Sequence, residues 1–152
     1  MTIFYQQGIL FIVMFFSALL LNPMNILAYQ MDDLYPSLTL VYASLYMAST
    51  MICTHQIVHY FQMGHFKVSV FGVGLLMMLV FVWLLRNQFG VTSEQWLRRM
   101  IPHHSTALTT TKKLLENEKM DDKTLRLAKT IVMTQRQEIH LMKCLLKKQK
   151  MR

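Results

Sequence analysis

Three long uncharged stretches are the first feature of this chain of 152 residues. Residues 8–29, 38–62 and 68–85 contain no Lys, Arg, Asp or Glu. A helix needs about 20 mainly apolar residues, with a range of about 17–25, to cross a bilayer. The pattern therefore predicts three transmembrane helices, which together make a membrane domain over residues 1–87. The first stretch lacks a basic start and a small-residue cleavage site, so we expect an anchor rather than a cleaved signal peptide.

From residue 91 onward, apolar positions recur at steps of three and four, which is the period of amphipathic helices. Thr92 followed by Gln95 fits a capping box for one helix, and Asp121 or Asp122 is a suitable N-cap for a second. The short turn between the two helices predicts an antiparallel hairpin over residues 91–150, so the fold class is all-α. The apolar face of the first helix consists of Trp96, Leu97, Met100, Ile101, Ala107, Leu108, Leu114 and Leu115. The apolar seam of the second consists of Leu125, Ala128, Val132, Gln135, Ile139, Met142 and Leu146.

Pro102 lies inside the first helix of this hairpin and is followed directly by His103 and His104. A proline at this position removes a backbone hydrogen bond and costs about 3 kcal/mol or more, so we expect a local kink. Folding the hairpin about residue 120 brings thioether, imidazole and carboxylate groups level with the histidines. By this count His104 is level with Gln135 or Arg136, His103 with Gln137 or Glu138, and Met100 with His140.

The charge is distributed unevenly along the chain. Residues 1–85 carry a net charge of −1, and residues 86–152 carry a net charge of +9, from fifteen basic and six acidic side chains. The basic side chains largely avoid the apolar seam and are not interleaved with aromatic residues, which argues against nucleic-acid binding. They favour a solvated face, with contact to anionic lipid as a secondary role. The two cysteines, Cys53 and Cys144, form no C-x-x-C motif and indicate neither a disulfide framework nor a cysteine zinc site.

The chemistry around the two histidines favours metal binding over catalysis. The sequence has no Gly-rich phosphate loop, G-x-S-x-G or H-E-x-x-H motif, so we expect no enzyme. Glu138 and His140 have the wrong spacing for a di-iron carboxylate site. Thioether and imidazole ligands suit a copper ion, and sulfur favours Cu(I). The predicted main ligands are Met100, His103, His104 and Met142, with Gln135, Glu138 and His140 as supporting or alternate ligands.

A second candidate metal site lies in the second predicted span. Five side chains follow each other there at steps of four, so they form one slowly winding stripe on a helix. Histidines inside a span are costly and usually face the interior of a helix bundle, where they have a function. In the other interpretation, methionine replaces leucine and the histidines lie near the membrane interface. The stripe consists of Met47, Met51, His55, His59 and Met63, and His65 in the following loop is close enough in sequence to join it.

Two motifs resemble the ferritin-like family catalogued as domain of unknown function 305. They are MIPHHSTAL from Met100 and LAKTIVMTQRQEIHLM from Leu127. The family's pattern, Met-x-Pro-His-His followed by Gln-x-x-Glu-Ile-x-x-Met, is matched over about residues 92–147. The N-terminal half is similar, more loosely, to membrane-anchored members that have a methionine-rich second span. The family usually has an aspartate near the position of Ser93. The matching positions are Met100, Pro102, His103, His104, Ala107, Gln135, Glu138, Ile139 and Met142.

The resemblance implies a hairpin of the ferritin-like, four-helix type and the binding of copper or another metal, often for metal tolerance at the cell envelope. It also implies a hairpin outside the cytoplasm, which we expect at a bacterial inner membrane. The basic residues that flank the spans lean towards the opposite orientation. We follow the resemblance because a short hairpin can be translocated as a unit. Since a single hairpin buries little apolar surface, we expect a homodimer that forms a four-helix bundle.

Two functions follow from the sequence. The first is a membrane-anchored metal-binding protein, for copper above other metals, in envelope metal homeostasis or tolerance. Its partners are the lipid bilayer and a second copy of the chain. The alternative is a structural or interaction module without metal that oligomerises through the hairpin. In that case His104 and Gln135 form a polar lock in the core of the bundle.

Overall fold

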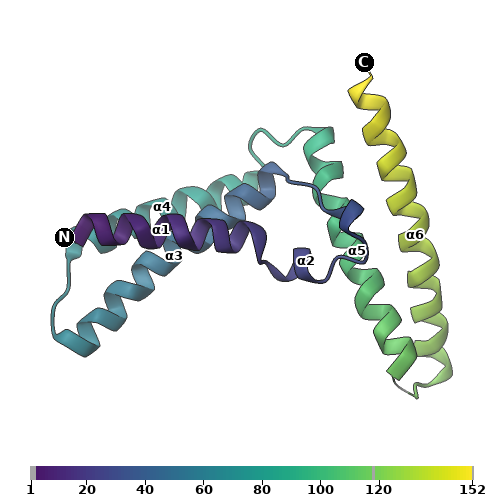
Figure 1. Ribbon diagram of the computed structural model, residues 1–152, viewed down its shortest axis with the longest axis horizontal. Helices are drawn as coiled ribbons and strands as arrows, with labels where there is room; N and C mark the ends of the chain where they lie inside the picture. The colour runs from purple at the N-terminus through teal and green to yellow at the C-terminus, as the bar shows by residue number, and fades with distance from the viewer. Residues whose placement is uncertain (1–2, 118, 152) are drawn as a thin grey trace. The chain divides into compact units, whose positions relative to one another are not determined.

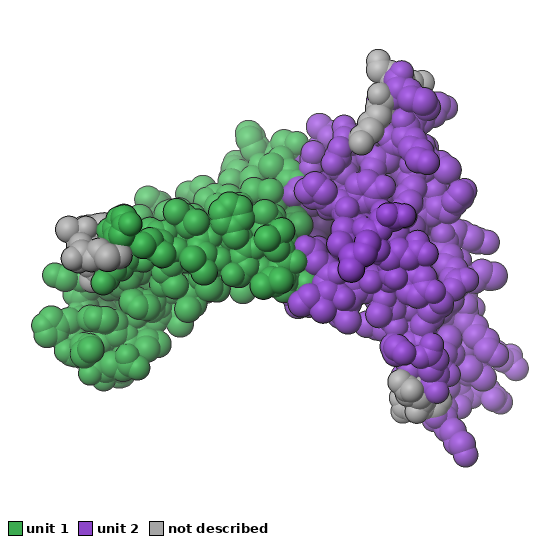
Figure 2. All heavy atoms as spheres, viewed as in Figure 1, with its two compact units in different colours: residues 1–22, 38–90 green, residues 23–37, 91–152 purple. Residues whose placement is uncertain are grey.

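The computed structural model describes residues 3–117 and 119–151, which are helical along most of their length (Figure 1). No β-strand occurs in these two ranges, so the predicted all-α class is confirmed. The chain forms two compact units, which are coloured differently in Figure 2. The hairpin unit includes a segment, residues 23–37, that the sequence pattern grouped with the membrane domain. The first unit contains Met1–Asn22 and Leu38–Gly90, and the second contains Pro23–Ser37 and Val91–Arg152.

The first unit consists of three long helices, α1 (Ile3–Leu20), α3 (Leu38–Met63) and α4 (Val68–Asn87). α3 packs against both α1 and α4. By length and composition, the segments Tyr5–Ile26 and Val68–Asn87 are apolar enough to cross a membrane, and few of their side chains are buried within the protein. α3 is longer but less apolar, because it carries serine, threonine, histidine and glutamine side chains.

Four hydroxyl side chains of α3 form hydrogen bonds within the helix. Ser44, Ser49, Thr50 and Thr54 each donate a hydrogen bond of 2.8–3.0 Å to the backbone carbonyl four residues earlier. This bond removes the need for a water partner and suits a hydroxyl group in apolar surroundings. The polar composition of α3 is therefore compatible with packing against apolar helices.

α3 and α4 approach each other closely at Gly74. A Cβ atom on Gly74 would lie 3.0 Å from Ile52 Cγ2 and 3.1 Å from Cys53 Sγ. A Cβ atom on Gly72 would meet nothing within 4 Å. Small residues let helix backbones approach in membrane-type packing. The contact thus requires a glycine at position 74 but not at position 72.

The second unit is built on a helical hairpin of α5 (Ser93–Asn117) and α6 (Asp122–Lys150), which run antiparallel and pack together (Figure 1). At the start of α5 the backbone N–H of Gln95 donates to Thr92 Oγ1 at 3.4 Å. At the start of α6 the side chain of Asp121 accepts two backbone N–H groups, at 2.9 and 3.1 Å. Side-chain acceptors of this kind satisfy the N–H groups left without partners at a helix start. Both predicted helix starts are therefore confirmed.

Pro102 does not interrupt α5. The helix is continuous from Ser93 to Asn117, and the proline is buried. The helical backbone thus continues through the position at which we expected a local kink. The Thr106 hydroxyl lies 3.0 Å from the carbonyl oxygen of Pro102 and 3.2 Å from that of Met24, so it can donate to either. The contacts of Thr106 therefore hold the turn of α5 that follows the proline.

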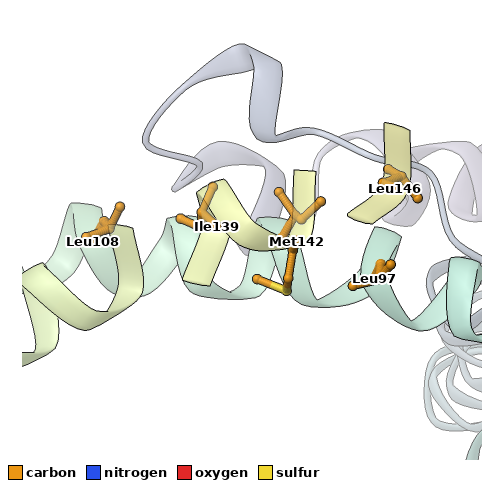
Figure 3. Close-up of a cluster of buried hydrophobic side chains, with 6 residues drawn as sticks. Leu97, Leu108, Ile139, Met142 and Leu146 are labelled. Atoms are coloured by element: carbon orange, nitrogen blue, oxygen red, sulfur yellow. The ribbon is translucent and has the colours of Figure 1, made fainter. Parts of the chain in front are cut away.

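The two helices share one apolar core (Figure 3). Its residues on α6 include Ile139, Met142 and Leu146, which lie beside α5 in the close-up. Within the predicted seam of α6, Ala128, Ile139, Met142 and Leu146 are buried, whereas Leu125, Val132 and Gln135 are half-buried. Trp96 and Leu114, which were expected on the apolar face of α5, are instead 51% and 37% exposed. The core consists of Leu97, Ile101, Leu108, Ile139, Met142 and Leu146, with Tyr35, Met100 and Val132 packed against it.

The segment between α1 and α3 covers part of this hairpin. It contains two short elements, α2 (Pro23–Ile26) and the 3-10 helix η1 (Met31–Asp33), and both lie against α5. Tyr35 packs on the apolar core. The guanidinium of Arg99 approaches the Met24 sulfur at 2.8 Å, and burial lowers the pKa of Arg99. The hairpin therefore finds a cover within its own chain.

A buried carboxylate fixes this cover in place. Asp33 is 2% exposed, and its Oδ1 forms an ion pair of 2.5 Å with Lys143 Nζ. Its Oδ2 accepts from the Ser105 hydroxyl at 2.6 Å, and Ser105 Oγ accepts from the backbone N–H of Tyr29 at 2.7 Å. A charge removed from water needs a paired charge and hydrogen bonds. Asp33 has both, one from each helix of the hairpin.

Replacing Gly74 by leucine should destabilise the first unit, because overpacking a close contact costs about 1–3 kcal/mol. Thermal unfolding of the full chain in detergent, followed by circular dichroism, measures the effect. Gly72→Leu is the matched control. Its melting temperature should equal or exceed that of the parent, since leucine forms helix better than glycine. Equal melting temperatures for the two variants would contradict the close contact.

Asp33→Asn should lower the stability of the second unit by about 3 kcal/mol, because breaking a buried ion pair leaves an uncompensated charge. The exposed neighbour Asp32 supplies the control, and Asp32→Asn should change stability by less than about 0.5 kcal/mol. Denaturant unfolding of both variants in detergent gives the two values. If Asp33→Asn unfolds at the same midpoint as Asp32→Asn, the ion pair does not hold the cover.

Candidate metal centre

His104 and Glu138 meet across the hairpin. His104 Nδ1 lies 3.0 Å from Glu138 Oε2, and the two side chains are 15% and 45% exposed. The Nδ1 atom itself is buried and lacks a well-aligned hydrogen bond. The carboxylate is therefore near enough for electrostatic attraction but is not in line with the ring nitrogen. A buried nitrogen with incomplete directional bonding is a chemically distinctive feature of the hairpin.

This contact lies at least two residues further along α6 than the count from the turn, which placed His104 level with Gln135 or Arg136. Side chains on a helix lean towards the N-terminus of their own helix. In an antiparallel pair, His104 therefore leans away from the turn and Glu138 leans towards it. The two side chains meet although their backbone positions are offset.

Two thioethers lie on the same helix faces as this pair. Met100 precedes His104 by four residues and Met142 follows Glu138 by four, and residues four apart share a face of a helix. Because α5 and α6 are antiparallel, both methionines lie one turn from the His104–Glu138 contact in the same direction. Met142 is 6% exposed, and Met100 packs against the same core. We call Met100, His104, Glu138 and Met142 the mixed-donor strip.

The other predicted ligands of the hairpin are placed differently. His103 is exposed, and its ring centroid lies 5.9 Å from that of His104. Gln135 is half-buried, one turn before Glu138. His140 is exposed and follows Glu138 by two residues, which is about 200° around a helix. Of the two supporting ligands Glu138 and His140, Glu138 contacts His104, whereas His140 lies on another side of α6.

Within residues 3–117 and 119–151, no three His, Cys, Asp or Glu side chains form a group that could hold a metal ion. Four-coordinate zinc sites and di-iron sites take at least three such ligands. The mixed-donor strip has one imidazole, one carboxylate and two thioethers. Its donors therefore fit a soft metal such as Cu(I) better than a hard one.

The predicted stripe on α3 is divided between different contacts. His55 Nδ1 lies 3.0 Å from Gln7 Nε2 of α1, so it accepts a hydrogen bond. His59 Nδ1 donates to the carbonyl of His65 at 3.0 Å, and His65 Nδ1 donates to that of Met63 at 2.7 Å. When neutral, each of these two rings keeps a lone pair on Nε2, and a ring nitrogen with a free lone pair can bind a metal. The methionines of the stripe are Met47, which is 50% exposed, Met51, which is half-buried, and Met63, which is 67% exposed.

Sequence reasoning missed several polar contacts of the second unit, and two of them involve chemically reactive groups. One is the pairing of Asp33 with Ser105 and Lys143, and the other is His140 Nε2 with Cys144 Sγ, 3.7 Å apart. Signals for both exist in the sequence. Asp33 and its neighbour are the only acidic residues before position 86, and Cys144 follows His140 at the spacing of one helix face.

Comparisons with known proteins bear on this hairpin and on the chain as a whole. Residues 85–146 match the family model described as Domain of unknown function (DUF305). The chain is also 30% identical over 143 residues to "Uncharacterized protein L153" of Acanthamoeba polyphaga mimivirus, covering 94% of this chain and 93% of that protein. This chain belongs to the DUF305 family.

The DUF305 match begins near the end of α4 and covers most of the hairpin, including the whole mixed-donor strip. The segment that carries Asp33 lies outside it. The similarity to L153 extends over both units of the chain. No solved structure matches. The family match therefore concerns the hairpin, whereas the sequence similarity to the viral protein extends over both units.

Proposed function

We propose that this DUF305 protein is a membrane-anchored copper-binding protein in metal homeostasis or tolerance. The observation that carries the proposal is the buried His104 Nδ1, which lacks an aligned hydrogen bond and lies on a strip with two thioethers and a carboxylate. An imidazole nitrogen in this state is a competent metal ligand. Copper bound there would be stored or passed on, and no catalytic step is part of the proposal.

The residues of the mixed-donor strip have complementary roles in this proposal. His104 and the thioethers of Met100 and Met142 hold the metal as soft ligands. Glu138, whose Oε2 lies 3.0 Å from the same ring nitrogen, is the alternate oxygen ligand. His103, on the exposed side of the same turn, receives the ion from solution. The Nε2 atoms of His59 and His65 offer a secondary contact for the same kind of ion.

We further propose that α1, α3 and α4 all cross the membrane. The apolar character of Tyr5–Ile26 and Val68–Asn87 supports two of the spans. The hydroxyl bonds within α3 support its inclusion as the third, since they satisfy four of its hydroxyl groups without water. With three spans the hairpin lies opposite the N-terminus, and we place it outside the cytoplasm. A viral relative gives no support to the bacterial inner membrane that the sequence led us to expect.

The copper proposal makes a direct prediction for the full chain in an uncharged detergent. Removing both thioethers by Met100→Leu with Met142→Leu should weaken Cu(I) binding at least about tenfold, as should His104→Ala. Leucine keeps the volume of methionine, so the double variant should stay folded. Competition with a chromophoric Cu(I) chelator measures the affinity.

Two control variants make the copper experiment specific. Met133→Leu removes a thioether that is 59% exposed on α6, and His140→Ala removes an imidazole from another side of that helix. Both should bind Cu(I) as the parent does. If His104→Ala also binds like the parent, the assignment of the site is wrong.

A second candidate function, self-association without metal, is favoured by exposed leucines on α6. Leu127, Leu141 and Leu145 are 60%, 58% and 43% exposed. Their spacing of fourteen and four residues places them on one face of the helix. Such a face fits a second copy of the hairpin, and a pair of hairpins would make the four-helix bundle of the sequence prediction.

The self-association function predicts a dimer of the full chain in density-matched detergent, measured by sedimentation equilibrium. Leu141→Gln with Leu145→Gln should shift the population to monomer, whereas Leu114→Gln on α5 should not. Copper then separates the two functions, because a ligand that binds the native state raises its melting temperature. A dimer whose melting temperature is unmoved by saturating Cu(I) would favour the second function over the first.

A further inference from the structure

A polar pocket lies in the second unit and is lined by none of the residues of the mixed-donor strip. It has a volume of about 380 Å³ and lies between the η1 segment and the hairpin. Every residue that lines it belongs to the second unit. Its size is at the lower end of the range for small-molecule sites, about 300–1,000 Å³. The polar residues of its wall are Tyr29, Gln30, Asp33, Arg136, His140 and Lys143.

The charges around this pocket are mainly positive. Asp33 is the acidic group in its wall, and the ion pair with Lys143 neutralises that charge. Arg136 has no ion-pair partner among the described residues. Lys112 donates a hydrogen bond to the Tyr29 hydroxyl, and its Nζ lies 4.2 Å from the centre of the Tyr29 ring. Lys112, chiefly through this hydrogen bond, and secondly Arg136 lower the pKa of Tyr29. Two cations therefore act on the phenol of Tyr29, beside a pocket that has room for an anion.

The donor groups suit a phosphate in particular. A guanidinium presents a fork of N–H groups that matches phosphate oxygens, and such charge-assisted bonds are among the strongest polar contacts. The phenol of Tyr29 and the imidazole of His140 can add further donors around the same space. The charge of Asp33 is already paired with Lys143, and its Oδ2 accepts from the Ser105 hydroxyl. Asp33 therefore holds the wall in shape instead of attracting a cation into the pocket.

We propose that this pocket binds a phosphate group, with Arg136 as its main contact and Tyr29 and His140 as supporting donors. The proposal does not depend on the copper site. Two sources of phosphate fit the chemistry, a lipid headgroup and free phosphate. Tyr29 follows the candidate span Tyr5–Ile26 by three residues, so no more than about 11 Å of chain separates it from the end of that span. This tether keeps Tyr29 within reach of a headgroup if the span is in a bilayer.

Isothermal titration calorimetry of the full chain in an uncharged detergent tests the proposal with two probes, inorganic phosphate and short-chain dihexanoyl phosphatidic acid. At least one probe should bind the parent protein. Arg136→Gln should weaken that binding by about tenfold to a hundredfold, the usual effect of losing a charge-assisted hydrogen bond. Arg126→Gln is the matched control, because it removes an exposed arginine of the same helix outside the pocket. It should change the affinity by less than about twofold.

The outcomes answer two questions, whether the phosphate site exists and whether its phosphate comes from a lipid headgroup or from solution. Phosphatidic acid binding at least tenfold tighter than phosphate assigns the pocket to a lipid headgroup, and equal or weaker binding assigns it to free phosphate. The proposal is overturned if neither probe binds the parent, or if Arg136→Gln and Arg126→Gln weaken binding equally. Tyr29→Phe keeps the ring over Lys112 but removes the hydroxyl. It should weaken binding several-fold, and it decides the question if Arg136→Gln unfolds.

Discussion

The second unit depends on one buried carboxylate. Asp33 joins the segment between α1 and α3 to both helices of the hairpin, through Ser105 on α5 and Lys143 on α6. A carboxylate in this position is stable only with those partners, so the pairing acts as a geometric constraint as well as an attraction. It brings Tyr35 onto the apolar core and Tyr29 to the wall of the polar pocket.

α6 serves several purposes because its faces are chemically different. One face closes the apolar core with Ile139 and Met142, and Glu138 reaches His104. About 200° round the helix from Glu138, His140 lies in the wall of the pocket, which Ile139 also lines. The proposed copper and phosphate sites therefore share a helix but have no residue in common. Each can be altered without the other, which is why their experiments use different variants.

Periodic features of this protein could be predicted from the sequence, and contacts between distant segments could not. The hairpin, its N-caps and the seam through Met142 follow from helical spacing and local hydrogen bonding. Glu138, the partner of His104, lies further along α6 than counting residues from the turn predicted, because side chains lean along the helix. The α3 stripe is divided because Gln7, on another helix, pairs with His55. Nothing in local spacing indicates that Asp33 would be buried against Ser105.

The order of residues in the second unit has a consequence for biosynthesis. Ser105 follows Asp33 by 72 residues, and all of α3 and α4 must be made between them. At about 5–20 residues per second, Asp33 waits roughly 4–15 s for Ser105 to emerge and longer for Lys143. During that interval the carboxylate has neither of these partners and must remain hydrated. Translation pauses within α3 or α4 would lengthen the time for which the cover is open to chaperones and proteases.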